Sequence, residues 1–123
     1  MLDLTTARMV HIRWIEQIKE ALQRGDVPHL DHYKNCDLGQ WLYQKGDQGG
    51  NRYLTFDEGK RLEEMHRQFH STADELTRVL AEKNYGNAEI LMREFNRESR
   101  DLIFLLSMLE YRILQLKQAG RIR

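Results

Sequence analysis

The stretch 87–119, NAEILMREFNRESRDLIFLLSMLEYRILQLKQA, decides the fold of this chain. Its apolar residues recur at steps of three and four, which places them on one face of a long helix. That stripe consists of Ala88, Met92, Phe95, Ser99, Leu102, Leu106, Leu109, Ile113 and Leu116. Between Leu102 and Leu109 the helix is apolar on nearly every side, so it must be covered from more than one direction. We therefore expect a homodimer in which a second copy packs on the surplus apolar surface.

Two further long helices follow from the same periodicity. The first is expected from about Asp3 to Arg24, with Thr5 or Thr6 as alternative starts, and Gly25 ends it. The second is expected from Thr55 to Lys83, where the sequence TFDE resembles a capping box. With a short helical segment over 38–43, these elements predict an all-α, up-and-down four-helix bundle.

The composition narrows the class of protein. The 123 residues suffice for one domain with a modest core, so we expect a single domain over 1–123. Basic and acidic residues number 19 each, which argues against a nucleic-acid-binding surface. No apolar run is long enough to span a membrane, and the N-terminus has no signal-peptide pattern. One cysteine cannot form an internal disulfide, which fits a cytoplasmic location.

Three of the five histidines fall on predicted buried stripes. On the first helix His11 lies in the row Leu4, Ala7, His11, Trp14, Ile18 and Ala21. On the second, His66 lies in the row Leu62, His66, Phe69, Ala73, Leu76 and Leu80, and His70 shares its face one turn later. His29 and His32 belong to a loop and are expected to be solvent-exposed, with either as a substitute ligand if the predicted helix faces are displaced. A buried histidine is commonly an ordinary core residue, but three that converge suggest a metal site.

Cys36 completes a possible ligand set. Three imidazoles and one thiolate fill all four positions of a tetrahedral Zn²⁺, which suits a structural or sensory site and leaves no position for an activated water. The stretch HRQFH lacks the glutamate of a zinc-protease motif. A ferritin-like di-iron centre would need two Glu-x-x-His pairs, and only Glu63 with His66 matches. Nothing in the sequence supports an enzyme.

The residues around Cys36 have structural roles in this interpretation. Gly39 permits close approach of the short segment to the bundle, and Trp41 is expected to anchor that segment in the core. Four acidic residues lie on helices from which they could orient an imidazole, although surface solvation is the expected role of each. They are Glu63, Glu94, Glu98 and Asp101.

The motifs taken together resemble the chemoreceptor zinc-binding (CZB) domain family. His11 and Trp14 form His-x-x-Trp; after 21 residues, Cys36 to Trp41 form Cys-x-Leu-Gly-x-Trp; after 24 more, His66 and His70 form His-x-x-x-His. The resemblance implies zinc held by His11, Cys36, His66 and His70 in a homodimeric helical bundle. It also implies a cytoplasmic bacterial signalling protein, of the kind often attached to a chemoreceptor or a diguanylate cyclase.

Three functions are compatible with such a site. The first is a zinc-responsive regulatory module that acts on a partner or output domain. No output domain is recognised in this sequence, so we expect either a stand-alone member that signals by binding another protein or an excised piece. The second is a redox sensor, because zinc keeps Cys36 as the thiolate that oxidants attack. The third is a purely structural zinc in a protein-interaction domain.

Overall fold

The computed structural model describes residues 4–25, 37–47 and 49–122, and all regular structure within them is helical. The prediction of an all-α fold is therefore confirmed for this part of the chain. The elements in chain order are α1 (Leu4–Gln23), α2 (Asp37–Tyr43), the 3₁₀ helix η1 (Asn51–Thr55), α3 (Asp57–Ala81) and α4 (Tyr85–Gln118). None of the helices in the described ranges is both long enough and apolar enough to cross a membrane.

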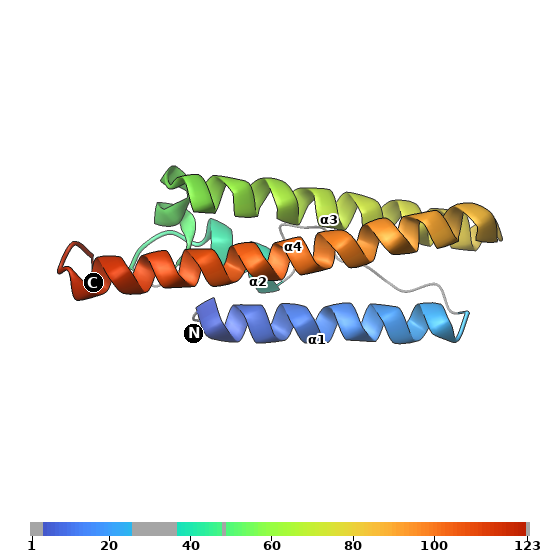
Figure 1. Ribbon diagram of the computed structural model, residues 1–123, viewed down its shortest axis with the longest axis horizontal. Coiled ribbons are helices and arrows are strands. Elements are labelled where there is room, and N and C mark those ends of the chain that lie inside the picture. The colour runs from blue at the N-terminus through green and yellow to red at the C-terminus, as the bar shows by residue number, and fades with distance from the viewer. Residues whose placement is uncertain (1–3, 26–36, 48, 123) are drawn as a thin grey trace.

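The helices α3 and α4 form the most extensive packing in the molecule and lie side by side along their length (Figure 1). Both predicted stripes face this interface, where Phe69 of α3 packs against Phe95 of α4 with ring centroids 4.8 Å apart. Both of these side chains are fully buried. Burying a phenylalanine contributes roughly 1.5–3 kcal/mol, so this interface supplies much of the stability of the fold.

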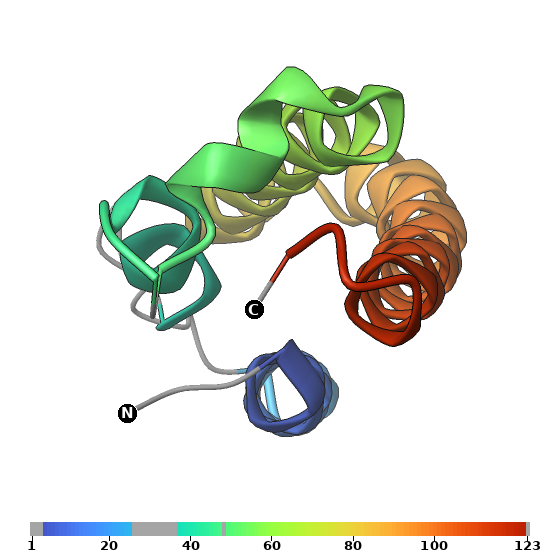
Figure 2. The same ribbon diagram turned by 90° about the vertical axis from the view of Figure 1, so that its left-hand side faces the viewer.

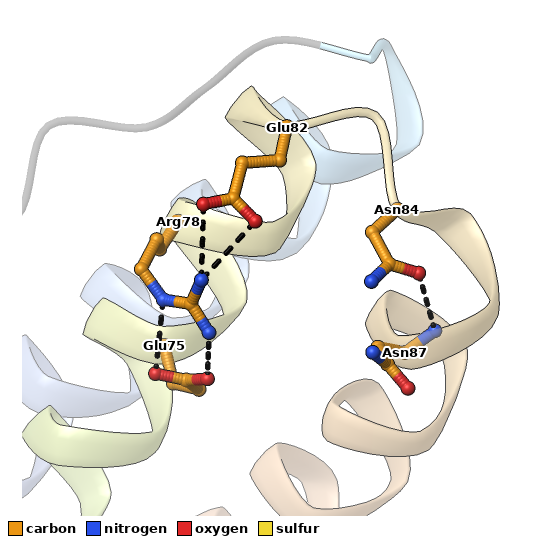
Figure 3. A network of polar contacts seen from close by, with 5 residues as sticks. All are labelled: Glu75, Arg78, Glu82, Asn84 and Asn87. Carbon is orange, nitrogen blue, oxygen red and sulfur yellow. Dashed lines mark hydrogen bonds and ion pairs between the residues drawn. The ribbon is translucent and has the colours of Figure 1, made fainter.

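A short turn reverses the chain between α3 and α4. Lys83 adopts a positive φ of 59°, and Asn84 then caps α4 by accepting a hydrogen bond from the backbone N–H of Asn87 at 3.3 Å. Before the turn, Arg78 bridges Glu75 and Glu82 on the exposed face of α3 (Figure 3). These ion pairs raise the pKa of Arg78 and lower that of Glu75. Such exposed pairs stabilise the end of the helix only slightly.

The helix α1 contacts α2 on one side and α4 on the other, as the end-on view in Figure 2 shows. Its Ile15 and Ile18 side chains are buried in the common core, and Met9 is exposed. Ile18 belongs to the predicted stripe, which is confirmed at this position. The side chains of its members Leu4, Ala7, His11 and Trp14 lie outside the described part of the structure.

The start of α3 differs from the prediction. Thr55 does not cap α3; it ends η1, and its hydroxyl donates to the carbonyl of Arg52 at 3.0 Å. Phe56 is the N-cap residue and makes no side-chain capping bond. The 3₁₀ turn that precedes α3 has taken the place of the predicted capping box. Gly59 permits this arrangement, because a Cβ there would collide with the carbonyl oxygen of Tyr53.

Candidate metal centre

His66 and His70 form a buried imidazole pair on α3. Their side chains are 1% and 2% exposed, their ring centroids lie 4.7 Å apart, and the ring planes meet at 85°. One helical turn separates the two residues, so both rings leave the same face of α3. The prediction that both lie on the buried face is confirmed.

Apolar side chains of α3 flank this pair in the part of the chain that the structure describes. Phe69 packs edge-on against His70, with centroids 6.1 Å apart, and Leu62 and Ala73 continue the same buried face along α3. Burying polar rings among apolar side chains is costly unless the ring nitrogens gain hydrogen bonds or a metal ion. Two neutral imidazoles with this spacing form half of a tetrahedral zinc site.

The structure describes the side chains of two of the four predicted ligands, His66 and His70. Within residues 4–25, 37–47 and 49–122, no three His, Cys, Asp or Glu side chains gather closely enough to hold a metal ion. His11 lies within α1, but its side chain is outside the described part of the structure. Cys36 also lies outside it, as do His29 and His32. The donor chemistry of His66 and His70 fits zinc, and the other two ligands, His11 and Cys36, stay predictions from the sequence.

The helix α2 begins at Asp37, immediately after Cys36 in the chain. Its Leu38, Gly39 and Leu42 are buried. Trp41 is 4% exposed and stacks on Tyr53 with centroids 6.1 Å apart, which confirms its predicted role as an anchor in the core. Gly50 approaches the other side of the indole so closely that a Cβ there would lie 2.6 Å from the ring.

A hydrogen bond joins α2 to α3 beside the histidine pair. The hydroxyl of Tyr43 donates to Glu63 Oε2 at 2.7 Å, one turn before His66. Arg67 Nη2 lies 3.8 Å from the same oxygen. The carboxylate of Glu63 therefore connects the segment that follows Cys36 to the helix that carries both histidines. Surface solvation, the role predicted for Glu63, is wrong, and no local sequence pattern links it to a tyrosine 20 residues away.

Glu98 is also misassigned by the sequence, because its side chain is only 3% exposed. It accepts a hydrogen bond from Thr72 Oγ1 at 2.7 Å across the α3–α4 interface. Burial raises the pKa of Glu98, and the bond from Thr72 opposes that shift. Glu94 and Asp101 are exposed, as predicted.

A comparison with protein-family models identifies the family. The model of the chemoreceptor zinc-binding domain matches residues 11–77, more than half of the chain. The matched segment begins at His11 and includes the motif around Cys36 and the pair His66 and His70. The chain belongs to the chemoreceptor zinc-binding domain family, the zinc-binding domains associated with chemoreceptor signalling. Neither the curated proteins nor the solved structures compared with the chain include a match.

Proposed function

We propose that this chain is a zinc-responsive regulatory domain in which His11, Cys36, His66 and His70 hold one Zn²⁺. The observation that carries the proposal is the buried, face-sharing pair of His66 and His70 within the segment that matches the family. Zinc in such a closed set would supply a crosslink between segments rather than a reactive water. We accordingly assign the domain no enzymatic activity.

The position of the ligands in the fold indicates what the crosslink would do. His11 belongs to α1, Cys36 directly precedes α2, and the histidine pair belongs to α3. Loading would tie these three segments of the bundle together, and unloading would release them from one another. A change in the offset of α1 or α2 is a signal that a partner can read, provided that the two states differ in zinc affinity.

The core of the α3–α4 pair makes a switch possible. Phe69, Phe95 and Leu102 are fully buried without any contribution from a metal. This packing should keep α3 and α4 folded after zinc leaves, while α1 and α2 loosen. A purely structural zinc would behave differently, since a fold that depends on its metal melts when the metal is removed.

The surface that we propose for dimerisation lies on α4. Four of the exposed large apolar side chains of α4 follow at steps of three and four toward its C-terminal end, Phe104 by 64%, Met108 by 37%, Tyr111 by 64% and Leu114 by 50% exposed. We name these four residues the α4 apolar stripe, and propose that it packs on a second copy of the chain. The homodimer would then act on a chemoreceptor or diguanylate cyclase type of output protein in the cytoplasm, without nucleic-acid binding or membrane insertion.

The test is a zinc titration combined with a measurement of helicity. Zinc-free protein, prepared with a chelator, is titrated against a fluorescent competitor while far-UV circular dichroism is recorded. The proposal expects one zinc per chain and a helical signal that changes little on loading. Loss of most helicity in the zinc-free protein would indicate a structural zinc instead. Rapid reaction of the zinc-bound Cys36 with mild oxidant, far faster than a control thiol, would indicate a redox sensor.

A further inference from the structure

A positively charged hollow lies between α1 and α4, apart from the histidine pair. It has a volume of about 510 Å³ and is lined by Lys19 of α1 and by Arg93, Asn96 and Arg100 of α4. The three residues of α4 follow at intervals of three and four, so they form one row along the helix. Among the lining residues that the structure describes, three are cations and one is an amide.

These cations are poorly neutralised by the protein. No carboxylate in the described ranges lies within ion-pair distance of Lys19 or Arg100. Arg93 contacts Glu89 at 3.2 Å, but the side chains are 74% and 73% exposed, so this pair is weak. Arg97, on a neighbouring face of α4, differs in having a 2.6 Å contact with Glu94. The chain as a whole has no net charge, whereas the described side chains that line the hollow include three cations.

Asn96 adds a neutral hydrogen-bonding group to the same site. Its Oδ1 is buried and has no hydrogen-bond partner in the described part of the structure. Its amide NH₂ group is the part of the side chain that can donate to a bound anion. Arginine, lysine and amide donors together form a set that suits phosphoryl oxygens, for which arginine provides paired donors.

We propose that this hollow binds a small anion carrying two or more phosphoryl groups, which bridges α1 and α4. A volume of about 510 Å³ is within the range of small-molecule sites and exceeds the needs of a single phosphate ion. The described part of the lining offers cations and an amide rather than an aromatic surface for a base, which favours recognition of phosphate groups. The bound anion relieves the repulsion among Lys19, Arg93 and Arg100 and holds α1 against α4.

Isothermal titration of the full chain with inorganic pyrophosphate tests the proposal. The double variant Lys19→Gln/Arg100→Gln should bind at least 10-fold more weakly than the unmodified chain. The matched control Arg13→Gln/Arg112→Gln removes one exposed cation from each of the same two helices without touching the hollow, and should stay within 2-fold. Because pyrophosphate also binds zinc, any heat from metal removal will appear equally in both double variants.

Two outcomes of the titration overturn the proposal. One is no saturable binding by the unmodified chain, and the other is equal weakening in both double variants, which would indicate general charge attraction. If the variants fold poorly, the unmodified chain gives an independent answer. Changes in its amide chemical shifts on addition of pyrophosphate should concentrate at the residues that line the hollow. Cosedimentation with phosphatidylglycerol vesicles distinguishes a lipid headgroup from a soluble phosphate. Vesicle binding without pyrophosphate binding would contradict the proposal.

Discussion

His66 and His70 stand one turn apart on α3 with ring centroids 4.7 Å apart, both almost completely buried. Residues four apart on a helix share a face whatever packs against them. The relative position of these two proposed ligands therefore follows from the local sequence alone. The other two proposed ligands come from separate segments, so their approach depends on how α1 and α2 are held. Contacts that hold α2 are therefore expected to influence zinc affinity.

The first prediction concerns Tyr43, which holds α2 against α3. Tyr43→Phe removes the 2.7 Å hydrogen bond to Glu63 and keeps the aromatic ring. The bond is worth about 0.5–1.5 kcal/mol, so zinc affinity should fall roughly 2- to 10-fold. Competition titration with a fluorescent chelator measures the change.

Tyr85→Phe provides the matched control for Tyr43, since it removes the hydroxyl of an exposed tyrosine at the start of α4. It should leave zinc affinity unchanged. Cobalt-substituted protein adds a spectroscopic test, because thiolate coordination gives a characteristic charge-transfer band. Equal affinities and identical cobalt spectra for Tyr43→Phe and the unmodified chain would show that this hydrogen bond does not position the site.

The second prediction concerns the pH dependence introduced by Glu98. Its raised pKa means that the folded state binds the proton more tightly than the unfolded state, whose ordinary value is 4.5. The contribution of Glu98 to stability is thus fully present below pH 4.5 and is lost as pH rises through the folded-state pKa. Glu98→Gln should remove this loss and leave the protein at least as stable at pH 7.5. Chemical denaturation at several pH values measures the free energy of unfolding of both proteins.

Glu89→Gln is the control for Glu98→Gln, because Glu89 is 73% exposed on the same helix and is not among the groups that raise the pKa of Glu98. Its stability should keep the pH dependence of the unmodified chain. Any pH dependence that all three proteins share cancels in the comparison. An unchanged pH dependence of stability in Glu98→Gln would mean that burial does not raise the pKa of the Glu98 carboxyl.

The third prediction concerns the α4 apolar stripe. Phe104→Glu/Tyr111→Glu places two charges on the proposed dimer surface, where desolvating them would be costly. The unmodified chain should elute with twice the 14.7 kDa mass of one chain, and the double variant with the mass of one chain. Light scattering coupled to size exclusion measures both.

Tyr85→Glu tests whether the effect on the dimer is specific. Tyr85 is 66% exposed at the start of α4, well away from the α4 apolar stripe. This variant should remain dimeric. An unmodified chain that is monomeric at all concentrations would contradict the proposed homodimer.

The recurrence of apolar residues at three- and four-residue steps predicted the long helices α3 and α4. Most members of the predicted stripes of α3 and α4 are buried, and Leu80, Met92 and Leu116 are half-buried. Apolar residues at three- and four-residue steps share one face of a helix, which packing then covers. The predicted start of α3 was wrong because the Thr55 hydroxyl had two possible partners. It bonds the carbonyl of Arg52 within the 3₁₀ turn instead of capping α3. Such competition between turn and cap cannot be settled from the residue types alone.

The acidic residues show a second limit of the sequence. Glu98 and Glu94 occupy the same helix within four residues, yet one is buried and the other exposed. The burial of Glu98 depends on Thr72, which lies 26 residues away and supplies the hydrogen bond. Tyr43 and Glu63 form a similar distant pair. Pairings of this kind arise from the packing of helices, so periodicity within one helix does not reveal them.

The most direct test of the central claim is the zinc content of the chain by mass spectrometry, measured beside His66→Ala, His70→Ala, Cys36→Ala and the control His29→Ala. The account predicts about one zinc per chain in the unmodified protein and in His29→Ala, and little or none in the other three. Unchanged zinc content in His66→Ala, or no zinc in the unmodified protein after reconstitution, would contradict the assignment of the buried histidine pair to a metal centre.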